Sequence, residues 1–346
     1  MSSTIELGLD TFGDVTYGAD GKLQHQARVL RDVVDEAVLA DELGLHFFGV
    51  GEHHRPDFAI SAPEVLLGAI AGRTKRIKLG TSVTVLSSDD PIRVYQRFTT
   101  LDAVSDGRAE IILGRGSFTE SFPLFGYSLQ DYETLFEEKL ELFAKLLEFD
   151  KTGDPVNWEG TIRTPLVRQK VYPRTESGRL TTWVGVGGSP ESVVRAARYQ
   201  LPLILAIIGG DPRRFMTFVE LYHRALEQFG AAKLPIGVHS PGHVAETDAK
   251  ARDELWPGYQ DMRNRIGAER GWGPTSRVEF EREVEAGSLY CGSPDTVARK
   301  IAATVKALGL ARFDMKYSSG PLGHDALIRS IELYGREVVP RVKEMV

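Results

Sequence analysis

Two adjacent histidines beside a carboxylate form the densest group of acid–base side chains in the sequence. They occur in Gly51-Glu52-His53-His54-Arg55, directly after the apolar run 45–50. Imidazoles titrate near neutral pH and a neighbouring carboxylate can orient them, so the pattern suits proton transfer or metal binding. A loop whose histidines only hydrogen-bond the backbone is the alternative at this point.

Two glycine-containing segments have the residue types that bind a phosphate. Gly114-Arg115-Gly116 places a guanidinium, which matches phosphate oxygens bidentately, between residues that allow close backbone approach. Gly187-Gly188-Ser189-Pro190-Glu191-Ser192 places serine hydroxyls and free N–H groups at a predicted helix start. Cys291-Gly292-Ser293-Pro294 is similar, but we favour the segment at 187–192 because it directly follows a strong strand-like run. A surface arginine in a flexible turn and a serine that only caps a helix are the alternatives.

Apolar runs that alternate with amphipathic stretches predict the elements that position these residues. Strand-like runs cover 5–12, 45–50, 77–86, 109–113, 181–186, 203–208, 236–239 and 312–316. Helical patterns begin near residues 28, 62, 91, 132, 190, 212, 246, 294 and 325. Eight strand–helix units predict an α/β fold, a single eight-stranded TIM-type barrel, with a doubly wound sheet as the alternative. In a barrel, residues that follow the strands gather at the C-terminal mouth.

Two segments interrupt the alternation. The segment 151–180 is polar and contains three prolines, and the segment 256–289 contains several glycines with Trp272 and Pro274. We interpret both as irregular insertions at the mouth of one barrel domain that spans residues 1–346.

Composition excludes several classes of function. The 346 residues have a formal charge of −6 and no polybasic cluster, which disfavours nucleic acid and acidic membranes as partners. A single cysteine, Cys291, excludes a disulfide framework and a cysteine-based zinc site. The first residues do not resemble a signal peptide, so we expect a cytoplasmic protein. Nucleotide fingerprints of the Rossmann or P-loop type are missing from the sequence.

The order and spacing of five segments resemble the bacterial luciferase-like flavin monooxygenase family. The first segment is Val50-Gly51-Glu52-His53-His54. The second is Leu79-Gly80-Thr81-Ser82-Val83-Thr84-Val85-Leu86, which continues to Arg93. Leu101-Asp102-Ala103-Val104-Ser105-Asp106-Gly107-Arg108 then leads to Leu113-Gly114-Arg115-Gly116, and Gly187-Gly188-Ser189-Pro190-Glu191-Ser192 completes the set. The resemblance covers nearly the whole chain and implies an eight-stranded barrel with reduced flavin at its mouth.

The resemblance also implies roles for individual residues. Arg115 matches the arginine that clamps the flavin phosphate in luciferase, with Gly116 beside it. Ser189, Ser192 and the backbone of Gly187 and Gly188 match the second half of that phosphate site, although luciferase has an acidic residue where this chain has Gly188. His53 matches the catalytic histidine. A non-proline cis peptide is expected between Ser82 and Val83, beneath the isoalloxazine ring, and the segment 256–289 is expected to be a mobile loop over the site.

The function implied is that of a two-component FMN-dependent monooxygenase. Reduced FMN would come from a separate flavin reductase, and O2 would oxidise a small organic substrate through a peroxyflavin, with His53 as acid–base group. The family is often dimeric, so a homodimer is expected. Further candidates for the pocket wall are Phe12, Phe48, His54, Phe118 and Ile207.

Three alternatives stay open on the sequence. One is hydride transfer with a deazaflavin cofactor, and another is a flavin-binding protein without catalysis. The third is a metal-dependent barrel hydrolase that uses His53, His54, His239 and His243, which we disfavour because no suitable aspartate follows the eighth strand. We therefore expect no metal site.

Overall fold

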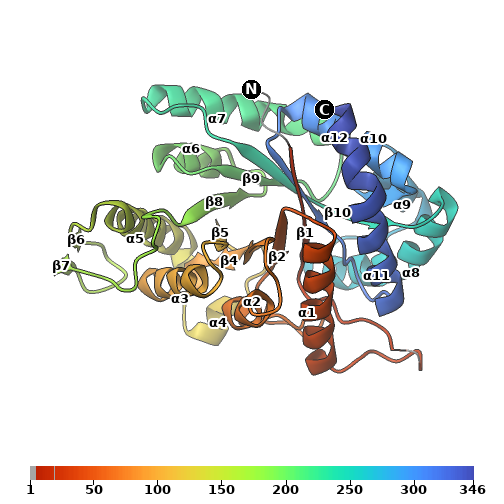
Figure 1. The fold of residues 1–346 in the computed structure, drawn as a ribbon, viewed down its shortest axis with the longest axis horizontal. Coiled ribbons are helices and arrows are strands. Elements are labelled where there is room, and N and C mark those ends of the chain that lie inside the picture. The colour runs from red at the N-terminus through yellow and green to blue at the C-terminus, as the bar shows by residue number, and fades with distance from the viewer. Residues whose placement is uncertain (1–4, 19) are drawn as a thin grey trace.

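Parallel strands form a nearly closed barrel at the centre of the molecule (Figure 1). The computed structural model describes residues 5–18 and 20–346. The strands of the barrel, in chain order, are β1 (Glu6–Thr11), β2 (Phe47–Val50), β3 (Lys78–Thr81), β4 (Thr84–Val85), β5 (Glu110–Gly114), β8 (Thr181–Val186), β9 (Leu203–Ala206), β10 (Ile236–Val244) and β12 (Arg312–Lys316). The predicted α/β barrel is confirmed.

The order of the strands explains why the sheet has ten strands and not the predicted eight. Hydrogen bonding runs β3-β2-β1-β12-β10-β9-β8-β5-β4, and the short strand β11 (Tyr290–Gly292) adds to β10 and makes ten. Residues 77–86 were expected to form one strand, but the strand is interrupted at Ser82–Val83 and gives β3 and β4. Because β3 and β4 belong to one stretch of chain, the two ends of the order meet, and a bridge between Leu79 and Ala109 joins them.

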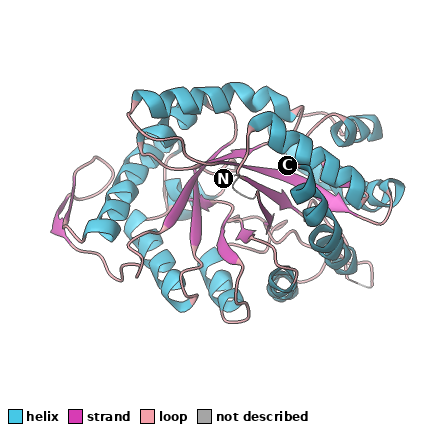
Figure 2. Cartoon of the chain, turned by 45° about the horizontal axis from the view of Figure 1, so that its top comes forward, coloured by secondary structure: helices cyan, strands magenta, loops and turns pink. Residues whose placement is uncertain are grey.

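Helices cover the outside of the barrel, as Figure 2 shows. They are α1 (Gln26–Glu42), α2 (Pro63–Ala71), α3 (Pro91–Val104), α5 (Tyr132–Thr152), α6 (Pro190–Arg198), α7 (Met216–Gln228), α10 (Pro294–Leu308), α11 (His324–Leu333) and α12 (Val339–Met345). Four of these helices, α2, α3, α6 and α10, begin with proline, whose missing N–H is not needed at that position. Among the residues described, none of the helices has both the length and the apolar character that a bilayer crossing requires.

The first interrupting segment is a small hairpin. Its strands β6 (Val156–Trp158) and β7 (Leu166–Gln169) are antiparallel, and they project beyond α5 at the left of Figure 1. The hairpin is separate from the barrel sheet.

The second segment was expected to be irregular over residues 256–289, and this expectation is wrong for most of its length. The helices α8 (Asp248–Arg270) and α9 (Arg277–Glu285) occupy it. The glycines inside α8 allow close packing: a Cβ at Gly258 would lie 2.9 Å from the Pro321 carbonyl oxygen. Gly271 ends α8 in the left-handed region, with a φ of 71°.

A buried ion cluster lies inside the barrel, below the mouth. Arg312 is fully buried, with its guanidinium 3.7 Å from the centre of the Phe47 ring. It pairs with Asp314 at 2.8 Å and with Glu110 at 2.6 Å. Burial raises the pKa of Asp314 to about 7, against the opposing effect of Arg312.

Candidate active site

His53 lies in an aromatic cluster at the mouth of the barrel, just after β2. Its side chain is 11% exposed, and its backbone N–H donates to the Ile60 carbonyl at 2.9 Å. The rings that contact its imidazole belong to Phe12, Phe58 and Phe118, with centroid distances of 4.6, 4.7 and 5.0 Å. The chain therefore holds this imidazole against apolar surfaces with little exposure to solvent.

Glu120 is the polar partner of His53. It directly precedes the short helix α4 (Ser121–Phe125), and its Oε1 lies 3.3 Å from Nδ1 of His53. Burial favours protonation of this carboxyl, but the hydrogen bond and charge of His53 outweigh it and lower the pKa of Glu120 below its usual value. A carboxylate at Nδ1 orients the ring and leaves Nε2 as the atom that can accept or donate a proton. Among the described residues, none forms a hydrogen bond with Nε2.

His54 has a different neighbourhood from His53. Its Nε2 lies 3.0 Å from Glu52 Oε1, and the other oxygen of Glu52 accepts from the Val85 backbone N–H at 3.1 Å. His54 is therefore tied to the ends of the strands through Glu52. Of the other suggested wall residues, Phe12 and Phe118 contact His53, whereas Phe48 and Ile207 are fully buried in the core.

The expected cis peptide between Ser82 and Val83 is present. The Ser82 N–H donates to the Val50 carbonyl at 2.9 Å, and the Val83 side chain is partly exposed inside the barrel. Val83 packs on two glycines, because a Cβ at Gly114 would lie 2.5 Å and one at Gly185 3.0 Å from its methyl groups. These close contacts explain why the neighbouring strands have glycine there.

Arg115 is connected with the start of α6 through two intervening side chains. Arg115 pairs with Glu133 at the start of α5, and the other oxygen of Glu133 lies 3.2 Å from Nη2 of Arg195 on α6. Nη1 of Arg195 in turn donates to the Ser192 hydroxyl at 3.4 Å. One chain of polar contacts thus connects Arg115 with Ser192.

The turn before α6 leaves free space beside its glycines. Ser189 caps the helix by accepting from the Ser192 N–H at 3.3 Å. A Cβ built at Gly187 or Gly188 would meet nothing within 4 Å, and Gly188 has a φ of 128°, which glycine adopts readily. Gly116 is also left-handed, with a φ of 78°, and its carbonyl accepts from the Tyr132 hydroxyl at 2.8 Å.

The sequence did not single out three residues of this region: Glu120, Glu133 and Arg195. Glu120 is 67 residues from His53, so no local spacing indicates their contact. Arg195 follows Ser192 by three residues on a predicted helix, which places both side chains on one helix face. This spacing could have identified Arg195 as a neighbour of the predicted phosphate site.

The end of α8 covers the aromatic cluster. Arg55 donates to Glu269 at 2.8 Å, and Arg265 pairs with Asp57 at 3.4 Å. Arg270 donates to the Ser117 carbonyl at 3.2 Å and lies 4.9 Å from the centre of the Phe118 ring. The part of the expected mobile loop that covers His53 is therefore the end of a helix. It is attached by ion pairs to the loop after β2 and by a hydrogen bond to the loop after β5.

The four histidines considered for a metal site have separate carboxylate partners. His239 pairs with Asp10 at 2.8 Å, and His243 pairs with Glu254 at 3.0 Å. Within 5–18 and 20–346, no group of three or more His, Cys, Asp or Glu side chains has an arrangement that could hold a metal ion.

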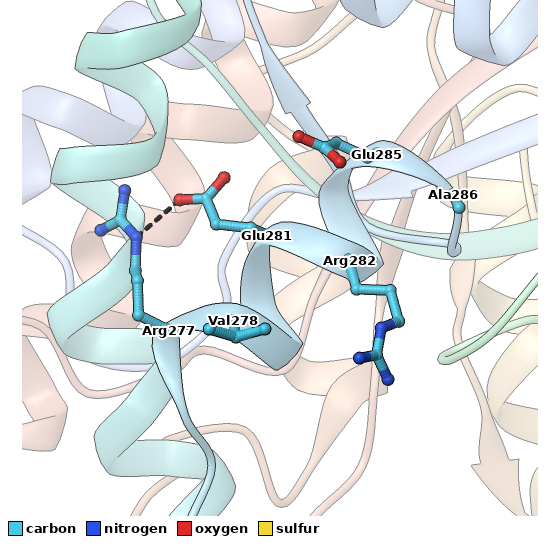
Figure 3. Close-up of a pocket in the computed structure, with 6 residues that line it drawn as sticks. All are labelled: Arg277, Val278, Glu281, Arg282, Glu285 and Ala286. Carbon is cyan, nitrogen blue, oxygen red and sulfur yellow. Dashed lines mark hydrogen bonds and ion pairs between the residues drawn. The ribbon is translucent and has the colours of Figure 1, made fainter.

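A surface hollow elsewhere has no connection with the mouth. Figure 3 shows it on α9, with Arg277 donating to Glu281 at 2.6 Å. The residues that line it are Arg277, Val278, Glu281, Arg282, Glu285 and Ala286. Because five of the six belong to α9 and Ala286 directly follows it, the hollow is a feature of one helix surface.

Comparisons with known proteins agree with this geometry. The family model described as luciferase-like monooxygenase matches residues 11–312. Limonene 1,2-monooxygenase of Rhodococcus erythropolis is 31% identical over 96% of this chain and 87% of its own length. 4-Hydroxyprotoasukamycin monooxygenase of Streptomyces nodosus subsp. asukaensis is 28% identical over 87% of this chain and 84% of its own length.

Solved structures share the fold at lower identity. The oxygenating constituent of 3,6-diketocamphane monooxygenase from Pseudomonas putida, a type II Baeyer-Villiger monooxygenase in complex with FMN, has a TM-score of 0.78 at 20% identity and covers 98% of each chain. The coenzyme F420 dependent tetrahydromethanopterin reductase of Methanopyrus kandleri has a TM-score of 0.73 at 19% identity, covering 98% of this chain and 99% of its own. The match of the family model over most of the chain, together with these relatives, shows that this protein is an enzyme of the luciferase-like monooxygenase family.

Proposed function

We propose that this enzyme is an FMN-dependent monooxygenase that uses reduced FMN and O2 to oxidise a small organic substrate at the barrel mouth. The observation that carries the proposal is the chain of polar contacts that connects Arg115, through Glu133 and Arg195, with Ser192 at the start of α6. A guanidinium, serine hydroxyls and the N–H groups of a helix start are donors that suit a phosphate monoester.

The residues at the mouth fit both ends of FMN, its phosphate and its ring system. The open space above Gly187 and Gly188 gives room for the phosphate, with Gly116 on the Arg115 side. Ser82 and Val83 would support the ring system, because the partly exposed Val83 offers an apolar surface inside the barrel. When bound, reduced FMN would supply the electrons with which O2 is reduced and the substrate oxidised.

His53 is the proposed acid–base residue. Glu120 at Nδ1 fixes the ring, so Nε2 is available to hold or move a proton beside the substrate. The surrounding aromatic rings and the end of α8 exclude water from this position. Exclusion of water favours transfer of oxygen to substrate over unproductive decay.

A deazaflavin is the second candidate cofactor, because the fold is shared with a coenzyme F420 dependent reductase. Our preference for FMN rests on Arg115 and the α6 start as a site for a terminal phosphate, and on the relatives named as monooxygenases. The third possibility, flavin binding without catalysis, is disfavoured by the His53–Glu120 pair, which phosphate binding alone does not need.

Isotope labelling distinguishes these functions. The purified enzyme is given chemically reduced FMN, labelled O2 and a panel of cyclic alkenes, cyclic ketones, aldehydes and thioethers, and products are examined by mass spectrometry. We expect one labelled oxygen atom in the product from at least one class. Substrate turnover with a reduced deazaflavin and no label in the product would instead support hydride transfer.

We also propose that a separate flavin reductase supplies reduced FMN and that the enzyme is a homodimer. Val65 on α2 and Val104 on α3 are 76% and 64% exposed on two helices that pack together, which suits an interface. Light scattering is expected to give twice the 38.3 kDa of one chain. Val104→Glu should shift the mass toward one chain, whereas Val278→Glu on α9 should not; a wild-type mass of one chain would contradict the dimer.

A further inference from the structure

The groups assigned to the flavin phosphate are already engaged by two carboxylates of the chain itself. Glu133 offers one oxygen to Arg115 and the other to Arg195, and the side chain of Glu133 is 60% exposed. Glu191 accepts a hydrogen bond from the Ser189 hydroxyl at 2.8 Å. A carboxylate therefore occupies each half of the proposed phosphate site.

Arg195 is held in place independently of Glu133. Its Nε pairs with Glu137, and Glu137 also binds Arg198 at 3.0 Å and the Tyr199 hydroxyl at 3.1 Å. The guanidinium of Arg195 lies 5.4 Å from the centre of the Phe136 ring, and the side chain is only 9% exposed. Removing Glu133 from this group would leave Arg195 where it is, with Nη2 free.

Glu133 is in the opposite situation, because nothing but the two guanidiniums holds its carboxylate among the described contacts. An exposed carboxylate gains little from an ion pair, since solvent screens the pair and water replaces it at small cost. A phosphate on Arg115 would also repel a carboxylate at ion-pair distance. The side chain can therefore leave for solvent when an anion arrives.

We propose that Glu133 is an internal competitor for the flavin phosphate, and that its displacement frees Arg195 as a second guanidinium for that phosphate. The inference rests on the proposed FMN function. This role suits a cofactor that must enter and leave in every cycle. The Glu133 carboxylate lowers the affinity for FMN and pairs again with both guanidiniums when the phosphate leaves. Arg195 is a binding residue in this account, and Glu133 tunes the affinity.

The test is Glu133→Gln, which keeps the shape of the side chain and removes its charge. Dissociation constants for FMN and for riboflavin, which lacks the phosphate, are measured by flavin fluorescence. We expect FMN to bind roughly two- to fivefold more tightly to the variant, the scale set by a partly exposed ion pair, with riboflavin unchanged. Glu141→Gln on the same helix, which removes an exposed carboxylate that pairs with Lys145 at 3.8 Å, is the matched control and should change neither value.

The outcomes separate this inference from the function on which it rests. If wild type prefers FMN to riboflavin but Glu133→Gln binds FMN equally or more weakly, Glu133 is not a competitor and the inference is wrong while the phosphate site stands. If wild type does not prefer FMN to riboflavin, the phosphate site itself is wrong. Glu133→Ala provides a second variant, and inorganic phosphate should compete with FMN more strongly in both variants than in wild type.

Discussion

At the scale of single residues, the carboxylate beside each histidine decides what that histidine can do. Glu120 faces His53 at the mouth, whereas Glu52 ties His54 to the strand ends and Asp10 holds His239 inside the barrel. The residue types alone did not distinguish His53 from His54, and only the family resemblance pointed to His53, because the partners that differ come from other segments. Only the fold brings Glu120 to His53.

Replacement of His53 tests its role directly. His53→Asn should lower turnover by roughly 10²- to 10⁴-fold, the usual contribution of a general acid–base group, because Nε2 is lost. The affinity for FMN should stay within about twofold, since His53 is not among the residues that we assign to the phosphate. Turnover is measured with a substrate identified by isotope labelling, and affinity by flavin fluorescence.

The control for this prediction is His223→Asn on the outer helix α7, which should change neither quantity. Equal turnover in His53→Asn and wild type would remove His53 from the mechanism. A parallel loss of FMN affinity would assign it to cofactor binding instead.

At the scale of elements, helices and strands with a strong hydrophobic periodicity were predicted reliably. Elements that depend on backbone contacts with distant segments were not. The eight predicted strand runs correspond to the barrel strands, and the helix starts near 28, 91, 132 and 294 agree with α1, α3, α5 and α10 within two residues. The strand β11 was missed because Tyr290–Gly292 is short and overlaps the glycine–serine–proline segment that precedes α10. Its pairing with Gly242–Val244 depends on a neighbour almost fifty residues earlier.

The helix α8 shows why the segment 256–289 was misinterpreted. Pro257, Gly258 and Gly267 all have low helix propensity, so their composition favoured a loop. The close approach of the Pro321 backbone requires a glycine at position 258 of the helix, and Trp272 packs closely on Gly267. These contacts are tertiary, and no property of the segment alone reveals them.

The packing of α1 against α11 should depend on pH. Glu36 accepts from His324 at 3.1 Å, and this hydrogen bond, supported by the charges of Glu36 and Asp32, raises the pKa of His324 against the opposing effects of burial and Arg28. A histidine whose pKa is raised on folding stabilises the protein fully below its unfolded pKa, about 6.5, and loses this contribution as the pH rises through the folded value.

His324→Gln should therefore cost roughly 1–2 kcal/mol of unfolding free energy at pH 6, on the scale of a charged hydrogen bond. The cost should shrink at pH 9. Urea unfolding of wild type and variant at both pH values measures it. A cost that is constant or larger at high pH would contradict the assignment.

At the scale of the whole molecule, the barrel is held together from inside by charge as well as by apolar packing. Arg312 connects β12 with Glu110 on β5, across the barrel, and contacts the rings of Phe47 on β2 and Trp183 on β8. The sequence predicted an apolar interior, because buried strands usually have apolar residues. The ion cluster depends on closure of the barrel and was not predictable from any single strand.

Arg312→Met should destabilise the protein by roughly 3–5 kcal/mol, because Glu110 and Asp314 would be left buried without their counter-charge. Asp314, whose pKa burial raises and Arg312 lowers, would then take up a proton more readily in the folded state, so the deficit should grow from pH 5 to pH 8. Urea unfolding measures the loss, with exposed Arg213→Met on the outer surface as control. A deficit below about 1 kcal/mol would contradict a structural role for the cluster.

The whole fold also brings together the separate segments in which the sequence predicted site residues. The segments at 50–54, 79–86, 113–116 and 187–192 all end at the same face of the barrel, so their residues meet without being neighbours in the chain. Their functional roles depend on what binds between them.

The most direct test is the ratio of the dissociation constants of riboflavin and FMN in wild type and in Arg115→Gln. We predict that wild type binds FMN roughly 10- to 100-fold more tightly than riboflavin, as charged hydrogen bonds to a phosphate imply. In Arg115→Gln the ratio should fall toward one while riboflavin affinity is unchanged. A ratio that is the same in both proteins would contradict a phosphate site at Arg115 and the start of α6.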